Sequence, residues 1–116
     1  MRKTLERPEK ITPDGDDDYF AELTKAVFRA GFSWQVIREK WPGFVQSFDQ
    51  FELARVASYG PADLERLFED QNIVRNRRKI MATVENARTM LDLISDHGSF
   101  HAYLRTLDQL DYYSRA

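Results

Sequence analysis

The stretch NIVRNRRKIMATVENARTMLDLISDH, residues 72–97, decides the fold of this chain. Its apolar residues recur at intervals of four and three, the spacing of one helical face: Ile80, Val84, Ala87, Leu91 and Ile94. A glycine at position 98 can end such a helix. We therefore expect one long amphipathic helix over residues 75–97, with shorter elements packed around it.

The start of this predicted helix is strongly basic. Positive charges stand at four of five consecutive positions, and an asparagine takes the other: Arg75, Asn76, Arg77, Arg78 and Lys79. Free backbone N–H groups and the positive end of the helix dipole make such a start a site for phosphate. The alternative is a solvated helix face, which is what most charge runs are. Against that, consecutive charges fan around the turn and do not pair with carboxylates one turn later. Because the net charge of the chain is only -2, any nucleic-acid contact here would be local.

Composition indicates a single folded domain. The chain has 116 residues, of which 42% are hydrophobic and 13% aromatic, enough for a modest core. It has no cysteine, which excludes disulfides and thiolate zinc sites and is compatible with a reducing compartment. No apolar stretch reaches the roughly 18 residues that span a bilayer, and the N-terminus does not resemble a signal peptide. We expect a cytoplasmic protein without membrane contact.

Residues 1–15 are charged, contain two prolines and predict a flexible arm; residues 16–116 predict one all-α domain. Four carboxylates lie within residues 14–18, where Asp16 or Asp17 can cap a helix that follows. Their spacing does not match a calcium loop. The next helix is expected to bury one stripe and to end at Gly31, which suits a left-handed cap. The stripe consists of Phe20, Leu23, Val27 and Ala30.

Four further helices complete the prediction of an all-α fold with about six helices. Ser33 can cap a helix from Trp34 to about residue 40, which Pro42-Gly43 should interrupt. Short helices are expected over residues 53–57 and 62–69, the latter with Pro61 at its tolerated first position. Ser99 can cap a final helix, which carries Phe100, Tyr103 and Leu104. No segment alternates with the period of two that a strand requires.

A second motif is the tight turn Ala30-Gly31-Phe32-Ser33-Trp34 between two predicted helices. Trp34 either packs in the core between those helices or offers an indole face on which a base extruded from DNA can stack. Seven residues later, Trp41 is better explained by core packing. Neither motif supplies a general base, and four carboxylates are expected to face solvent: Glu52, Glu65, Glu69 and Glu85. His97 and His101 are separated by the helix break at Gly98 and are not expected to share a metal.

The two motifs, in this order and about 40 residues apart, resemble the DNA-3-methyladenine glycosylase I family. The resemblance runs from about Tyr19 to Leu107, most of the chain. It is carried by Phe20-Ala21-Glu22-Leu23, the Ala30–Trp34 turn, Phe44, Phe48, Asp63-Leu64-Glu65-Arg66-Leu67, Ile73-Val74-Arg75-Asn76-Arg77-Arg78-Lys79-Ile80 and Asn86-Ala87.

The resemblance implies a helix-hairpin-helix DNA glycosylase fold and base-excision repair of alkylated adenine. Enzymes of this kind flip the damaged base out of DNA and hydrolyse its N-glycosidic bond. By resemblance, Trp34 lines the base pocket with Phe32 and Ser33, and residues 75–79 lie on the DNA-facing side. The partner would be duplex DNA with an alkylated base. No cofactor is implied, because the family's Cys/His zinc site cannot form without cysteine.

The chain departs from the family pattern in three ways. The pocket glutamate that the family usually carries eight residues before the tryptophan is replaced by Ala26, and no residue is identified as a catalytic acid or base. The aromatic residues and histidine of the family's N-terminal pocket segment are not recognisable in residues 1–18. The half of the fold that carries the DNA-binding hairpin would follow the end of this chain.

Two alternatives to an active glycosylase follow. In the first, which Ala26 favours, the chain is a DNA-binding relative that has lost glycosylase activity. In the second, which the acidic balance favours, the chain is an all-α protein–protein interaction module. In either case, apolar side chains near the end of the chain predict contact with a second copy or with the missing half: Leu110, Tyr112 and Tyr113.

Overall fold

A computed structural model describes residues 15–115, with side chains described up to residue 108. It contains α1 (Asp16–Arg29), α2 (Trp34–Ser47), the 3-10 turn η2 (Asp49–Phe51), α3 (Leu53–Ala57), α4 (Pro61–Phe68), α5 (Arg77–His97) and α6 (Phe100–Arg115). Between residues 15 and 115 there is no strand, so the prediction of an all-α fold with about six helices is confirmed. Fourteen of the fifteen residues of the predicted flexible arm, residues 1–14, lie outside this range.

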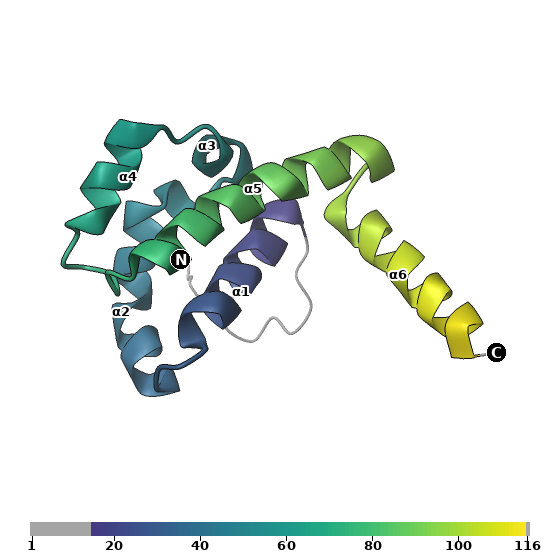
Figure 1. The fold of residues 1–116 in the computed structure, drawn as a ribbon, viewed down its shortest axis with the longest axis horizontal. Coiled ribbons are helices and arrows are strands. Elements are labelled where there is room, and N and C mark those ends of the chain that lie inside the picture. The colour runs from purple at the N-terminus through teal and green to yellow at the C-terminus, as the bar shows by residue number, and fades with distance from the viewer. Residues whose placement is uncertain (1–14, 116) are drawn as a thin grey trace, which may run out of the picture.

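The long helix α5 crosses the molecule and contacts α1, α3, α4 and α6 (Figure 1). Of the predicted stripe, Ile80, Val84 and Ala87 are buried, while Leu91 and Ile94 are half-buried. Thr83 and Met90 are also buried, which extends the packed face beyond the prediction. The helix begins at Arg77 and not at residue 75, because the side chain of the preceding asparagine caps it.

The buried face of α1 differs from the predicted stripe. Phe20, Thr24 and Phe28 are buried, whereas Leu23 is 36% exposed and Ala30 is exposed. The buried residues are spaced by four, so they lie on one face. Thr24 can be buried there because its hydroxyl donates to the carbonyl oxygen of Phe20 at 2.9 Å. The stripe prediction was therefore wrong for Leu23 and Ala30, whereas Val27 is half-buried and packs against the core.

The carboxylates at the start of α1 cap other helices. The N-cap of α1 is Gly15, which has no capping side chain. Asp17 Oδ1 accepts from the backbone N–H of Leu53 at 2.9 Å, and Asp16 Oδ1 accepts from the N–H of Phe100 at 2.9 Å. The prediction that they cap the helix that follows them was wrong, because the starts of α3 and α6 pack beside them and supply the donors.

Pro42 does not interrupt α2, which continues to Ser47, so this prediction was also wrong. A proline removes one helical hydrogen bond, but the apolar face of α2 remains buried past it, with Phe44 fully enclosed. Gly43 allows the chain to approach closely, since a Cβ atom there would lie 2.2 Å from the carbonyl oxygen of Asn72. The glycine thus serves packing against the turn that precedes α5.

Stacked aromatic rings fill the space between α1, α2 and η2. The Trp41 ring lies 5.0 Å from that of Phe51 and 5.5 Å from that of Phe44, centre to centre. Phe48 continues the stack, 5.5 Å from Phe51. Such pairs add to the free energy gained by burial alone. The prediction that Trp41 packs in the core is confirmed.

Left-handed backbone forms the η2 turn: Asp49, Gln50 and Phe51 have φ values of 54°, 57° and 54°. This region is unfavourable for residues other than glycine, so neighbouring contacts must hold the turn. The carboxylate of Asp49 accepts a hydrogen bond from the hydroxyl of Tyr59, which is 5% exposed. Burial, with Asp49 beside it, raises the pKa of that hydroxyl.

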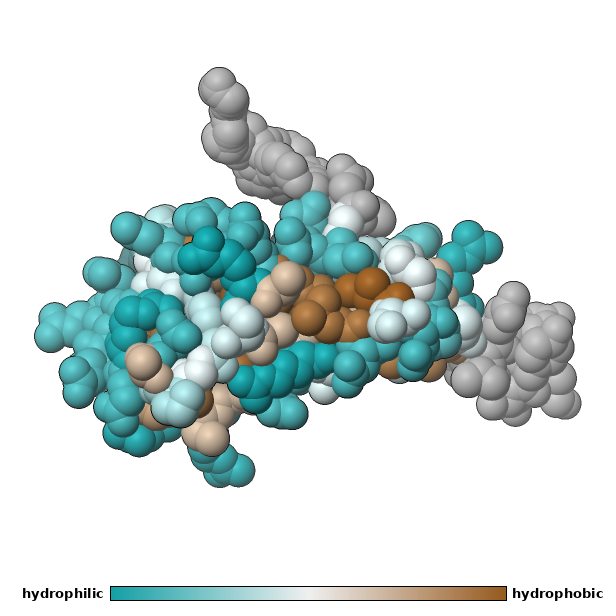
Figure 2. All heavy atoms as spheres, turned by 90° about the horizontal axis from the view of Figure 1, so that it is seen from above, coloured by the Kyte–Doolittle hydropathy of each residue, from teal (hydrophilic) through white to brown (hydrophobic). Residues whose placement is uncertain are grey.

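Helix α6 contacts the other helices near its start and then projects away from them (Figure 1). There the Tyr19 hydroxyl and His101 Nδ1 are hydrogen-bonded at 2.9 Å, and the Tyr19 and Phe100 rings are 5.3 Å apart. Apolar side chains gather near the C-terminal half of α5 (Figure 2). The side chains predicted to meet a partner lie outside the described ones: Leu110, Tyr112 and Tyr113.

Candidate nucleic-acid interface

The turn between α1 and α2 places two aromatic rings on the surface. Gly31 adopts a φ of 83°, as predicted for a left-handed cap, and the N–H of Phe32 donates to the carbonyl oxygen of Arg29 at 3.0 Å. Ser33 then caps α2, its hydroxyl accepting from the N–H of Val36 at 3.2 Å. This path leaves Phe32 41% exposed and Trp34 38% exposed. The interpretation of Trp34 as a core residue is therefore wrong.

Two cations from α1 lie beside the exposed indole. Arg29 Cζ is 5.3 Å and Lys25 Nζ is 5.9 Å from the centre of the Trp34 ring. Lys25 also lies 5.0 Å from the centre of the Trp41 ring, so it connects the exposed and core indoles. An accessible aromatic face with positive charge beside it has the two features that bind a base and its phosphate.

Lys25 and Arg29 were not identified from the sequence as residues of this surface. They are separated by four residues and so share a face of α1, which the spacing alone reveals. That this face meets the start of α2 depends on the angle between the two helices.

The basic stretch is ordered by a helix cap. Asn76 Oδ1 accepts from the N–H of Lys79 at 3.0 Å, which closes the first turn of α5. Three residues before this cap, Ile73 is 2% exposed and packs in the core. The cap places Arg77, Arg78 and Lys79 in the first turn of a 21-residue helix, with Arg75 two residues earlier. The free N–H groups and positive helix end are thus next to all four cations.

The four cations have different surroundings. The guanidinium of Arg77 lies 4.4 Å from the centre of the Phe68 ring at the end of α4. Lys79 Nζ donates to the carbonyl oxygens of Ala30 and, at 3.5 Å, of Phe28. Arg75 and Arg78 are exposed and form no ion pair with any residue that the structure describes. These two are the cations most available for phosphate.

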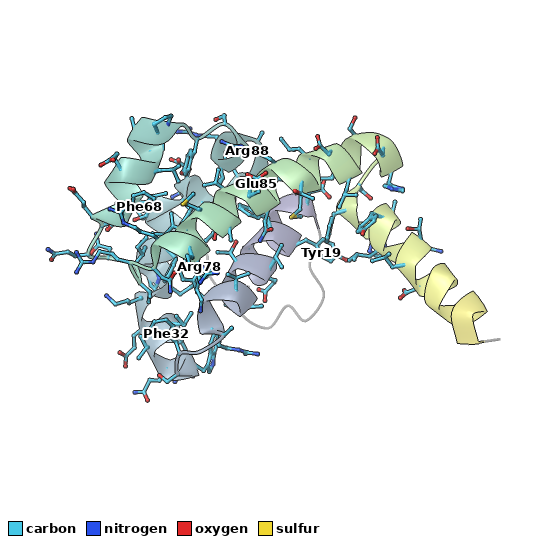
Figure 3. All side chains as sticks on the ribbon, in the orientation of Figure 1. Tyr19, Phe32, Phe68, Arg78, Glu85 and Arg88 are labelled. Atoms are coloured by element: carbon cyan, nitrogen blue, oxygen red, sulfur yellow. The ribbon has the colours of Figure 1, made fainter. Side chains whose placement is uncertain are left out.

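Lys79 joins the two motifs. Besides its hydrogen bonds to the end of α1, its ammonium lies 5.1 Å from the centre of the Phe32 ring. In the view of Figure 3, Phe32 and Arg78 accordingly lie toward the same end of the molecule, with Tyr19 toward the other end of α1. The aromatic turn and the basic turn, distant in sequence, therefore form one continuous surface.

This surface has no evident acid or base. Ala26 is exposed on α1 and offers only a methyl group. The four glutamates expected to face solvent are all exposed: Glu52, Glu65, Glu69 and Glu85. Across residues 15–115, no three His, Cys, Asp or Glu side chains lie close enough together to hold a metal ion. His101 bonds to Tyr19, while the His97 ring lies 5.3 Å from that of Tyr103, so each histidine has its own contact.

No helix among the described residues is long and apolar enough to cross a membrane.

Comparison with known proteins supports the resemblance seen in the sequence. The family model described as methyladenine glycosylase matches residues 11–114. The chain is 38% identical over 65 residues to DNA-3-methyladenine glycosylase 1 of Escherichia coli (strain K12), covering 56% of this chain and 35% of that protein. It is 29% identical over 63 residues to DNA-3-methyladenine glycosylase of Haemophilus influenzae, covering 54% and 34% respectively.

Solved structures share this fold. A 3-methyladenine DNA glycosylase I (TAG) from Staphylococcus aureus, solved to explain its recognition of 3-methyladenine, matches with a TM-score of 0.74 at 32% identity. The match covers 80% of this chain and 50% of that one. A TAG variant in complex with 3-methyladenine matches equally well, over 78% and 49%. The chain thus spans about half the length of these structures and about a third of the curated relatives. Because the family model covers nearly all of its residues, the chain belongs to the methyladenine glycosylase family.

Proposed function

We propose that this chain takes part in DNA base-excision repair as a 3-methyladenine DNA glycosylase-type protein, which recognises alkylated adenine and hydrolyses its N-glycosidic bond. One observation carries the proposal. The exposed indole of Trp34, with Arg29 5.3 Å from it, belongs to the Ala30–Trp34 turn, whose Phe32 ring lies 5.1 Å from Lys79 Nζ at the start of α5. The relatives named above carry this activity in their names, and family membership supports its transfer to this chain.

The proposed roles follow from the side chains. Trp34 and Phe32 stack on the extruded base, with Ser33 and Ala26 at the edge of the pocket. Arg75, Arg77 and Arg78 bind the DNA backbone together with the helix start that Asn76 caps, and Lys79 belongs to the same turn. Such contacts would be blind to sequence and weakened by salt.

The chemistry asks little of the protein beyond recognition. An N3-alkylated adenine is cationic, so it attracts the face of an indole and leaves easily. Water attacks the sugar carbon, the bond to the base breaks with its electron pair, and the base leaves as a neutral molecule while the water loses a proton. No group of this chain is assigned to accept that proton, so stacking and positioning are what its residues would contribute.

A catalytically inactive DNA-binding relative is the second candidate, and Ala26 favours it. The methyl group cannot make the contact to the adenine edge that a glutamate at this position would make. In that case the surface would still bind duplex or abasic DNA with a salt-dependent affinity, without releasing base.

Methylated duplex DNA provides the test. The chain is incubated with it and released 3-methyladenine is quantified, with Trp34→Ala as the matched control. Release that exceeds the control supports a glycosylase. DNA binding without release identifies the inactive relative, and the absence of both release and DNA binding would refute the proposed function.

Two further expectations stay proposals. We propose that the protein is cytoplasmic. We also propose that Leu110, Tyr112 and Tyr113 contact a second copy or the rest of a glycosylase fold; sedimentation as a monodisperse monomer at micromolar concentration would contradict the dimer.

A further inference from the structure

We propose that Lys79 is a positioning residue: it holds the Ala30–Trp34 turn, and through it the indole of Trp34, and does not contact phosphate. The inference rests on the proposed function, since it assigns Lys79 a task in the same DNA-facing surface. It distinguishes Lys79 from the other cations of the basic turn by the contacts that each side chain makes.

The end of α1 offers Lys79 its ligands. The last carbonyl groups of a helix have no partner within the helix and carry the negative end of its dipole. Here the carbonyl oxygen of Arg29 accepts from the N–H of Phe32, and that of Ala26 accepts from the N–H of Ala30. The carbonyl oxygens of Phe28 and Ala30 are the ones that receive the ammonium of Lys79.

These contacts occupy the Lys79 ammonium within the protein. A lysine has three N–H donors, and hydrogen bonds to two carbonyl oxygens use two of them. The Phe32 ring lies 5.1 Å away and adds a cation–π contact. The backbone N–H of the same lysine is already bonded to the cap, Asn76 Oδ1. Arg78, one residue earlier, is exposed and has none of these contacts.

The consequence is a coupling between the two motifs. Ala30 and Phe32 flank Gly31, whose left-handed φ of 83° sets the direction of the chain into α2. Trp34 is the first residue of α2, so the place of its indole depends on that direction. By binding on both sides of Gly31, Lys79 fixes the stacking residue relative to the start of α5. A base on Trp34 and a phosphate on Arg78 would then be held at a set separation, which is what positioning contributes to catalysis.

Fluorine NMR tests the coupling without DNA. The full chain is labelled with 5-fluorotryptophan, which gives one resonance for Trp34 and one for Trp41, assigned with a Trp34→Phe variant. We expect Lys79→Met to shift or broaden the Trp34 resonance and leave the Trp41 resonance in place, and Lys79→Arg to restore it in part. The matched control Arg78→Met should move neither. If Lys79→Met unfolds, which both resonances would reveal, Lys79→Gln takes its place. An unmoved Trp34 resonance in the Lys79 variants overturns the proposal.

DNA binding provides the second arm. Each phosphate contact contributes about 0.9 to the slope of log affinity against log salt concentration on duplex DNA. We expect Arg78→Met to reduce this slope by about 0.9, and Lys79→Met to weaken binding to DNA with an alkylated base at an unchanged slope. A Lys79→Met slope reduced as much as that of Arg78→Met overturns the proposal. If the unaltered chain binds no DNA, the proposed function fails, while the fluorine spectra still decide the role of Lys79.

Discussion

The carboxylate of Asp17 accepts a hydrogen bond of 2.9 Å from the backbone N–H of Leu53, 36 residues later. The first turn of α1 thus caps α3, a helix of five residues with no capping side chain of its own. Such a short helix is marginal without tertiary contacts. The contact therefore stabilises the segment that connects the left-handed turn to the rest of the core.

Replacing Asp17 with alanine should lower the free energy of unfolding by about 1 kcal/mol, because the N–H of Leu53 loses its acceptor. Asp17→Asn keeps an acceptor oxygen and should lose less. Urea unfolding followed by circular dichroism measures both. Equal losses in the two variants would show that charge, and not the cap, is what matters.

Tyr59→Phe should change how stability depends on pH. The folded-state pKa of the Tyr59 hydroxyl is raised by burial and by Asp49, so its contribution is complete at low pH. Above about pH 10 the unfolded chain loses this proton while the folded chain retains it, and stability falls. Tyr59→Phe should be less stable near neutral pH and should lose less stability between about pH 9 and 11. Parallel pH profiles for the two proteins would contradict the expectation.

The two tryptophans should respond oppositely to alanine. Trp41 stacks on Phe44 and Phe51 in the core, so Trp41→Ala should destabilise the fold by about 3 kcal/mol. Trp34 is 38% exposed, so Trp34→Ala should cost less than about 1 kcal/mol. On the proposed function it should nevertheless abolish most binding of 3-methyladenine. Thermal unfolding and fluorescence titration with the free base separate the two effects.

The double variant Arg75→Gln/Arg78→Gln removes two phosphate contacts. It should therefore reduce the slope of log DNA affinity against log salt concentration by about 1.8. Arg105→Gln is the matched control, because it removes one exposed charge on the projecting helix α6. Fluorescence anisotropy with labelled duplex DNA at several salt concentrations gives the slopes. A control slope that falls by about 0.9, half the effect of the double variant, would mean that only the number of charges removed matters.

Ala26→Glu should strengthen binding of 3-methyladenine about 10-fold or more, the size expected when a charged group gains a hydrogen bond. The site is exposed, so the larger side chain fits without disturbing the core. Ala54→Glu adds the same charge at an exposed position of α3 and should have no effect. Isothermal titration with the free base measures both. Unchanged affinity in Ala26→Glu would remove Ala26 from the proposed pocket.

The features that the sequence predicted correctly depend on residues that are close together in the chain. Gly31 and Gly98 have φ values of 83° and 93°, Ser33 caps α2, and Pro61 begins α4, as expected from their chemistry. The helix content and the family motifs are likewise local. In each case the residues that decide the conformation lie within about one helical turn of one another.

Predictions that required knowledge of distant residues failed or stayed open. Trp34 and Trp41 have the same side chain and lie seven residues apart, yet one is exposed and the other stacked in the core. Pro42 was expected to end a helix, but burial of Phe44 beyond it outweighed the lost hydrogen bond. Both outcomes depend on what packs against α2, which no local pattern records.

By itself, the sequence determined an all-α chain of about six helices, most of their boundaries, and the two motifs that indicate the family. Only the tertiary structure decided what each charge touches. Asp16 and Asp17 cap helices far along the chain, and Lys79 binds the end of α1 while Arg78 stays exposed. The physical reason is that helix formation depends on contacts within a few residues, whereas the partner of a charged side chain depends on which helix ends the packed core brings beside it.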